Sequence, residues 1–315
     1  MKVLITGGGG FLGSRVAQAL RARHPGARIR LMDMTFPAGL DEGFERVEAD
    51  VSSPQALASA LGKDTDSIFH MAAVVSGGAE MDFDLGYRVN LDGTRALLEA
   101  CRGLSRPPKV VYASSVAAFG GALPEVLDDS TMPTPQTSYG TQKVIGEYLV
   151  ADLTRKGMID GRSLRLPTIV VRPGKPNLAA SSFASGIIRE PLNGVAADCP
   201  VPDSTGVWIL SPRRVVDAFL HAHDLPSSAW PWGRVVNLPG ITLTVREMID
   251  AMERVAGKEV AARVRFTPDA RIQAIVKTWP VRFSTARALA MGFNADPDFE
   301  SVVRDYIENY VASPA

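Results

Sequence analysis

Residues 3–13 read VLITGGGGFLG, a short apolar run that ends in a row of glycines. Helical spacing of apolar residues follows at 11–23, so the glycines lie between a predicted strand and a predicted helix. Such a turn lets the backbone approach a pyrophosphate, while the helix N-terminus offers N–H groups and the positive end of its dipole. Gly7, Gly10 and Gly13 fit the spacing G-x-x-G-x-x-G, and this setting predicts a dinucleotide-binding turn.

Apolar strand-like segments alternate with helical ones through the first half of the chain. The strand-like segments are 28–32, 67–71, 109–113 and 163–171, and long helices are expected at 88–101 and 138–156. This alternation predicts an α/β protein with a doubly wound parallel sheet of the Rossmann type. We expect residues 1–172 to form the dinucleotide-binding domain and 173–315 a smaller substrate lobe. A strand returning to the sheet near 205–240 would make the two interleaved.

Composition narrows the class of partner. With 315 residues and 46% hydrophobic content, the chain can bury a sizeable core. The 34 basic and 34 acidic side chains cancel, which argues against a nucleic-acid or membrane partner and favours small molecules. The N-terminal residues MKVLITGGGG have neither a signal peptide nor a membrane span, so we expect a cytoplasmic protein.

The cysteines and histidines do not predict a metal site. Cys101 and Cys199 lie far apart without ligand spacing around them, which is typical of reduced thiols in a reducing compartment. His221 and His223 are two positions apart on a predicted helix and therefore face different ways. His70 ends a predicted strand beside the glycine turn, and we expect it to be a hydrogen-bonded wall residue.

An acid follows the glycine turn at the distance expected for a ribose ligand. Asp33 ends the second predicted strand, twenty residues after Gly13. A carboxylate there can accept hydrogen bonds from the adenosine ribose and would repel a 2′-phosphate, and no arginine follows it, so NAD is favoured over NADP. The alternative is a solvated loop acid. Asp50 and Val51, after the third strand, could line the adenine pocket, but Asp50 could equally be a turn residue.

The segment 138–143, SYGTQK, places a phenol and an amine one helical turn apart. Tyr139 and Lys143 can therefore point into the same cleft. A phenol with a usual pKa of about 10 is a poor base at neutral pH, but a nearby ammonium and a helix N-terminus favour the phenolate. Such a group can take the proton of an alcohol while hydride leaves for a nicotinamide. On its own, this pair is more often part of an ordinary amphipathic helix.

Five motifs then occur in a fixed order along the chain: TGGGGFLG, FHMAAVVSGG, YRVNLDGTRALLEAC, YASSVAAFG and SYGTQK. Together they resemble the extended short-chain dehydrogenase/reductases over nearly the whole chain. The catalytic set that this resemblance implies is Ser115, Tyr139 and Lys143. Ser115 is preferred to Ser114 as the group that orients the substrate oxygen, because it stands five positions before Gly120. Asn90 matches an asparagine that stabilises a helix and a proton-relay water near the active site.

The same resemblance implies the cofactor contacts and the assembly. Lys143 would hold the nicotinamide ribose, and helices 88–101 and 138–156 would pair two copies into a homodimer through a four-helix bundle. The residues expected to contact NAD are Gly7, Gly10, Phe11, Leu12, Gly13, Asp33, Asp50, Val51, Ala72, Asn90, Tyr139, Lys143, Pro167 and Thr168.

Most members with this architecture act on nucleotide sugars, but two segments depart from their pattern. Residues 165–168 read RLPT where Arg-x-x-Asn is usual, and residues 210–217 read LSPRRVVD where Ile-His-Val-Asp-Asp is usual. The segments SGGAEMDFDLG, LPTIVVRPGKPN and SSFASGIIREPL instead resemble a branch that oxidises the 2-hydroxyl of a four-carbon sugar acid, D-erythronate, with NAD. A nucleotide-sugar epimerase or dehydratase with tightly bound NAD is the alternative.

A sugar-acid substrate requires a cation or a cluster of N–H and hydroxyl groups for its carboxylate, since a buried unpaired charge is costly. The candidates are Ser76, Gly77, Ser115, Thr168, Arg172, Ser182, Arg189 and Arg213. Each arginine could instead form a surface or interlobe ion pair, and Ser182 could simply cap the helix that follows it.

Overall fold

The computed structural model describes residues 1–40, 43–174 and 179–311. The chain divides into two compact units, each built from three stretches of sequence. Unit 1 comprises Met1–Ala118, Thr137–Arg165 and Val216–Val236, and unit 2 comprises Phe119–Gln136, Leu166–Val215 and Asn237–Ala315. Among the described helices, none is long and apolar enough to cross a membrane. The assignment of a cofactor lobe and a substrate lobe stays a prediction.

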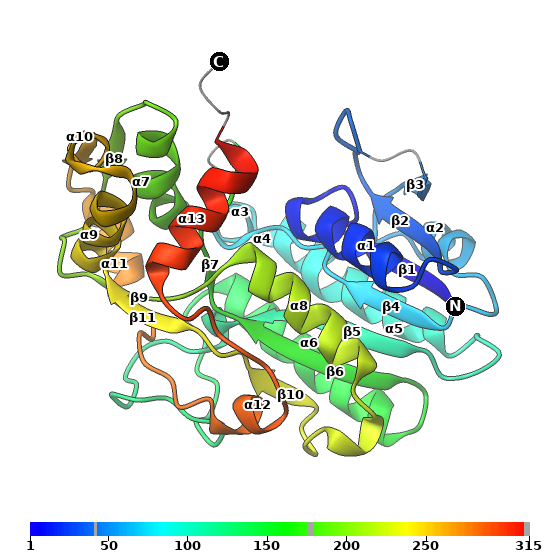
Figure 1. Ribbon diagram of the computed structural model, residues 1–315. Helices are drawn as coiled ribbons and strands as arrows, with labels where there is room; N and C mark the ends of the chain where they lie inside the picture. Colours follow the sequence, from blue (N-terminus) through cyan, green and yellow to red (C-terminus); the bar gives the residue numbers. More distant parts are fainter. Residues whose placement is uncertain (41–42, 175–178, 312–315) are drawn as a thin grey trace. The chain divides into compact units, whose positions relative to one another are not determined.

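A seven-stranded sheet forms the centre of unit 1 (Figure 1). Its order is β10-β6-β5-β4-β1-β2-β3, and the pairs β1/β2, β2/β3, β1/β4 and β4/β5 are parallel. The chain therefore winds outward in one direction from β1 and in the other from β4, which confirms the predicted doubly wound α/β class. The strands are β1 (Lys2–Thr6), β2 (Arg28–Asp33), β3 (Glu45–Glu48), β4 (Ser67–His70), β5 (Lys109–Ser115), β6 (Asp160–Leu166) and β10 (Val235–Asn237).

Helices cover this sheet and supply its core. Leu57, Leu97 and Val150, from three different helices, are fully buried in one cluster with Leu4 and Val110 of the sheet. The expected helix at 88–101 begins as a π-helical segment that continues into a regular α-helix. The helices are α1 (Phe11–Arg23), α2 (Pro54–Ala60), α3 (Ser76–Met81), α4 (Phe83–Gly86), η1 (Tyr87–Asp92), α5 (Gly93–Cys101), η2 (Val116–Ala118), α6 (Ser138–Arg155), α8 (Pro212–Asp224) and η3 (Ser227–Ala229).

The prediction of a single strand at 163–171 is wrong, because the chain passes from one sheet to another within this segment. β6 ends at Leu166, and β7 (Thr168–Ile169) belongs to the three-stranded sheet β11-β9-β7 of unit 2. Pro167 lies between the two strands. A proline has no N–H to donate to a ladder, so an interior strand cannot continue through it.

Unit 2 has a core of its own, in which Val170, Ile187, Ile209, Met248 and Val303 are buried together. β7 pairs parallel to β9, β9 pairs antiparallel to β11, and β8 pairs parallel to β12. Its remaining elements are α7 (Ser182–Leu192), β8 (Ala197–Cys199), β9 (Gly206–Leu210), β11 (Ile241–Thr244), α9 (Val245–Ala256), α10 (Lys258–Ala261), β12 (Val264–Phe266), α11 (Ala270–Val276), α12 (Ala286–Ala290) and α13 (Phe299–Tyr310).

Candidate active site

The glycine turn between β1 and α1 is too closely packed for larger residues. Gly7 has φ of 71°, and a Cβ added to it would lie 2.7 Å from the Ala72 amide nitrogen. A Cβ added to Gly13 would lie 2.1 Å from the Gly7 carbonyl oxygen. The turn therefore requires glycine at both positions. Ala72, which follows β4, lies against this turn, and its contact with NAD stays a prediction.

The N-terminus of α1 and Asp33 fit the adenosine diphosphate half of NAD. Gly10 is the N-cap residue and contributes no side-chain cap, while the first amide groups of the helix, including those of Phe11 and Leu12, have no intrahelical acceptor. Asp33 lies beside them, because its Oδ2 accepts a hydrogen bond from the Gly9 amide at 3.0 Å. An anion and a ribose can be held at these positions.

Asp50 and Val51 have local structural roles. The Asp50 Oδ1 accepts hydrogen bonds from both the amide and the hydroxyl of Ser52, each at 2.8 Å, so this carboxylate stabilises the turn before α2. Val51 is buried in the core of unit 1. Their contact with an adenine ring stays a prediction.

Asn90, which is buried in η1, forms hydrogen bonds to two parts of the candidate site. Its Oδ1 accepts from the Val74 amide at 2.7 Å, and its Nδ2 donates to the Val74 carbonyl at 3.0 Å and to Gln142 Oε1 at 2.7 Å. The loop after β4 is thereby tied to α6. This agrees with a helix-stabilising role, while direct contact with the cofactor stays a prediction.

Helix α6 positions the two residues of the phenol–amine pair. Its N-cap Thr137 accepts a hydrogen bond from the Gly140 amide at 3.1 Å, which places Tyr139 in the first turn. Lys143 is buried, and its Nζ lies 5.5 Å from the centre of the Tyr139 ring and 5.0 Å from that of Tyr112. The ammonium is thus held near two phenol rings, as cations are at aromatic faces.

Lys143 also binds the main chain of the neighbouring strand. Its Nζ donates a hydrogen bond to the Ala113 carbonyl at 2.7 Å. Burial lowers the pKa of Lys143 to about 8, and the negative charge of Glu147 opposes that shift. An amine of this kind can change charge close to neutral pH.

The two adjacent serines at the end of β5 have different surroundings. Ser114 is buried and donates to Glu147 Oε1 at 2.5 Å, so its hydroxyl is bound to α6. Ser115 is half-buried, and its Oγ accepts from the Ala117 amide at 3.1 Å. Successive side chains of a strand face opposite sides. The geometry therefore favours Ser115 over Ser114 as the serine that could meet a substrate.

The unit 1 candidates gather at the carboxyl ends of adjacent strands. β1 ends at the glycine turn, β4 ends two residues before Ala72, and β5 ends at Ser115. In doubly wound sheets, ligands bind at this edge. Ser76 and Gly77 belong to the first turn of α3, which follows the loop that Asn90 fastens.

Several unit 2 candidates form hydrogen bonds or ion pairs with neighbouring residues. The Arg172 amide donates to Ser185 Oγ at 3.1 Å, and Arg189 donates to the Arg172 carbonyl at 2.8 Å and to Glu190 Oε1 at 2.6 Å. Arg213 lies 3.6 Å from Asp305 and is half exposed. Arg189 and Arg213 thus take part in ion pairs, the alternative that the sequence left open.

Two other unit 2 candidates lie at the starts of their elements. Thr168 opens β7 and pairs with Ile209, directly after Pro167. Ser182 is the first residue of α7, but the N-cap position belongs to Ser181, so Ser182 is not the capping residue. Residues 175–177, the end of the segment LPTIVVRPGKPN, lie outside the described residues.

The prediction that His70 is hydrogen-bonded is confirmed, whereas its place in the wall of the cofactor site stays a prediction. Its Nδ1 bonds Thr6 Oγ1 at 2.7 Å and its Nε2 bonds Thr94 Oγ1 at 2.8 Å. Burial, with a smaller contribution from the Lys143 charge, lowers the pKa of His70 to about 3. The ring therefore stays neutral at physiological pH and stacks on Tyr112.

One buried acid of the site was not predicted from the sequence. Glu147 on α6 binds Arg165 of β6, with Arg165 Nη2 at 2.6 Å from Glu147 Oε2. The available signal was its spacing, because Glu147 follows Lys143 by four residues and Tyr139 by eight. An arginine inside the apolar strand 163–166 was a second signal that a buried anion lay nearby.

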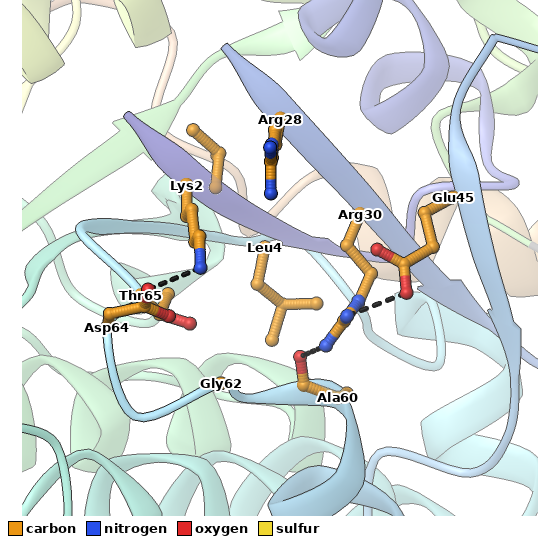
Figure 2. Close-up of a pocket in the computed structure, with 10 residues that line it drawn as sticks. Lys2, Leu4, Arg28, Arg30, Glu45, Ala60, Gly62, Asp64 and Thr65 are labelled. Atoms are coloured by element: carbon orange, nitrogen blue, oxygen red, sulfur yellow. Dashed lines mark hydrogen bonds and ion pairs between the residues drawn. The ribbon is translucent and has the colours of Figure 1, made fainter.

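A cavity of about 130 Å³ lies at the other end of β1 and β2 (Figure 2). Four of its charged lining residues form two pairs, since Lys2 binds Asp64 and Arg30 binds Glu45, and Arg30 also binds the Ala60 carbonyl. It is lined by the first residues of the strands, away from their carboxyl ends. We assign it no role in the candidate active site.

Comparison with known proteins shows the family of the chain. Residues 3–229 match the model of the NAD dependent epimerase/dehydratase family. The chain belongs to this family. It is 54% identical to the D-erythronate dehydrogenase of Cupriavidus necator, with 98% of each chain covered, and 45% identical to the D-erythronate dehydrogenase of Haemophilus influenzae, with 98% of this chain and 99% of that one covered.

A solved structure adds a different name at similar coverage. The nucleoside-diphosphate-sugar epimerase from Agrobacterium tumefaciens superposes with a TM-score of 0.90 at 40% identity, covering 99% of this chain and 94% of the other. Family membership and the dehydrogenase relatives identify the protein as an NAD-dependent oxidoreductase.

Proposed function

We propose that the protein oxidises the 2-hydroxyl of D-erythronate to 2-oxo-tetronate with NAD. The observation that carries this proposal is the 54% identity, over nearly the full length of both chains, to a protein named D-erythronate dehydrogenase. The placement of a phenol, a buried amine and a serine at the carboxyl edge of a doubly wound sheet supports it.

The proposed roles follow from the chemistry of each group. Tyr139, as phenolate, takes the proton of the 2-hydroxyl, while Ser115 Oγ holds the substrate oxygen. Lys143 favours the phenolate and binds the nicotinamide ribose. NAD, when bound, would accept the hydride of C2 at its ring carbon C4, so the alcohol would become a ketone while the Tyr139 phenol carries the proton.

The cofactor would be held by the glycine turn and by the acid beside it. The amides of Phe11 and Leu12 would bind the pyrophosphate, which can come close because Gly7 and Gly13 keep the turn tight. Asp33 would accept hydrogen bonds from the adenosine ribose. Residues proposed to bind the sugar acid are Ser76, Gly77, Ser115, Thr168, Arg172, Ser182, Arg189 and Arg213.

The test is a screen of four- to six-carbon aldonic acids with NAD, followed by the absorbance of NADH. D-erythronate is expected to give the highest kcat/KM, and NADP to be a much poorer cofactor because of Asp33. If D-erythronate is inert while another aldonic acid is oxidised, the substrate is misassigned. If no acid yields NADH, the proposed activity is wrong.

A nucleotide-sugar epimerase is the second candidate, favoured by the name of the Agrobacterium tumefaciens structure. Such an enzyme would keep its NAD bound through turnover and release no net NADH. Against it, Thr168 stands where nucleotide-sugar enzymes have a diphosphate-binding asparagine. Incubation with a panel of UDP and GDP sugars, followed by chromatography of the products, distinguishes the two candidates.

We also propose a homodimer formed through residues 88–101 and α6. Tyr148, on α6, is 66% exposed in the single chain, and an interface would bury such a ring. Sedimentation at micromolar concentration is expected to show a dimer. A monomer only would remove this part of the proposal, as would a dimer that a Tyr148→Glu substitution leaves intact.

A further inference from the structure

Helix α6 carries a buried carboxylate to which the proposed chemistry assigns no role. Glu147 is only 5% exposed. Removing a carboxylate from water is costly unless it is paired and hydrogen-bonded, so a buried acid needs specific partners. Glu147 therefore calls for an explanation that goes beyond the packing of α6.

Partners from two strands hold this carboxylate. Arg165 of β6 donates from Nε to Oε1 at 2.8 Å and from Nη2 to Oε2 at 2.6 Å. This is the two-pronged geometry that makes an arginine–carboxylate pair strong and directional. Ser114 of β5 adds a third donor to Oε1 at 2.5 Å. The carboxylate is thereby fixed in one orientation between α6 and the sheet.

The same face of α6 carries the candidate catalytic residues. Tyr139, Lys143 and Glu147 follow one another at intervals of four residues, so they lie along one side of the helix. That side faces β5, because Lys143 binds the carbonyl of Ala113 and Glu147 binds the hydroxyl of Ser114. Two consecutive residues of β5, Ala113 and Ser114, thus bind two consecutive turns of α6. Ser115 follows them directly in the strand.

Glu147 differs in its charge from the other titratable groups around Lys143. The titratable groups that face it from the packed elements are Tyr139, Tyr112, His70, Glu147 and, behind Glu147, Arg165. Burial holds the pKa of Tyr112 well above its usual value and that of His70 at about 3, so both are neutral near pH 7. Glu147 is the carboxylate among these described groups, and its negative charge raises the pKa of Lys143.

We propose that Glu147 is a positioning residue that supplies the counter-charge for the buried ammonium of Lys143 and locks α6 to the end of β5 through Ser114 and to β6 through Arg165. This inference rests on the role proposed above for Lys143. Burial lowers the pKa of Lys143 and the Glu147 charge raises it, so the acid helps to keep the Lys143 amine positively charged at the pH of the cell. Arg165 limits this effect, because it shares the same carboxylate.

The test measures Lys143 itself, without any substrate. The chain has eight lysines, so protein labelled with ¹³C at lysine Cε gives a sparse NMR spectrum in which Lys143→Arg assigns the Lys143 signal. Its chemical shift is followed against pH in the wild type and in Glu147→Gln. The negative charge of Glu147 raises the pKa of Lys143, so the midpoint is expected to fall when that charge is removed.

Two further variants make the result specific. Asp152→Asn removes an acid from the same helix, but Asp152 is exposed and pairs with Arg155, so it should leave the midpoint unchanged. Arg165→Gln frees Glu147 from its competitor and should move the midpoint upward. Arg165→Gln also removes a nearby positive charge, so the specific result is the fall in Glu147→Gln, which a purely structural role for Glu147 does not predict.

An unchanged midpoint in folded Glu147→Gln would overturn the inference. If that variant does not fold, Arg165→Gln decides, and a midpoint that stays or falls there overturns it. The substrate proposal is judged separately by NADH formation in the wild type, so the failure of one is distinguishable from the failure of the other.

Discussion

Units 1 and 2 hold their candidate polar groups in different ways. In unit 1, Lys143 is buried and bound to a strand carbonyl, and its neighbour Glu147 is gripped from two strands. In unit 2, Arg213 is half exposed and paired with a surface acid, and Arg172 belongs to an irregular segment after β7. The first arrangement suits chemistry that must be the same for every substrate, whereas the second suits recognition that can change between related enzymes.

The largest effect is expected from the phenol of unit 1. Tyr139→Phe removes the proposed base and keeps the ring, so turnover should fall by about 10²–10⁴-fold. NADH binding, measured by its fluorescence, should change little, because the glycine turn and Asp33 are intact. The matched control is Tyr148→Phe, because Tyr148 is an exposed tyrosine on the same helix. Retained turnover in Tyr139→Phe would mean that the base lies elsewhere.

Lys143 offers a second test through pH. Its pKa is about 8 in the folded chain and 10.5 when exposed, so between these values the unfolded chain binds more protons than the folded one. The free energy of unfolding should therefore contain a contribution that rises with pH from about 8 to 10.5. Lys143→Met should lack this contribution in urea denaturation and should also lose most turnover. Parallel pH curves for the two proteins would refute the burial of a titrating amine.

The loss of the Lys143 charge should also affect how kcat/KM depends on pH. kcat/KM for the proposed oxidation is expected to decline above about pH 8 as the ammonium is lost, which weakens both ribose binding and the stabilisation of the phenolate. Lys143→Arg keeps a positive charge and should abolish this decline even if its overall rate is lower. A decline that persists unchanged in this variant would assign it to another group.

Smaller effects are expected in unit 2, mostly on KM. Arg172→Ala should raise the KM for the sugar acid by about 10-fold, the size of a lost charge-assisted hydrogen bond, with kcat little changed. Arg213→Ala should change KM by less than about twofold, since this side chain is half exposed and pairs with Asp305. The reverse order of the two effects would mean that Arg213, and not Arg172, contributes more to binding of the sugar acid.

Local sequence patterns were sufficient to predict the fold of unit 1. The glycine spacing identified a turn that steric contacts show to require glycine, and alternating periodicity identified the parallel sheet. The strand at 163–171 was mispredicted, because its apolar character continues through Pro167 while the hydrogen-bonded ladder cannot.

The candidate site was less predictable than the fold. Spacing alone placed Tyr139 and Lys143 on one helix face. It could not show that Asn90 binds Val74 and Gln142, or that Arg189 binds Glu190, because these partners are chosen by tertiary packing. Ion pairs that neutralise an arginine have no local sequence pattern, and they decide whether it is available to a ligand.

The central claim, that hydride leaves C2 of a sugar acid for a nicotinamide beside Tyr139, can be tested with D-erythronate deuterated at C2. The account predicts NADH that carries the deuterium at nicotinamide C4, detected by mass spectrometry and NMR. NADH formed without deuterium would place the oxidation at another carbon, and the absence of NADH would contradict the proposed reaction.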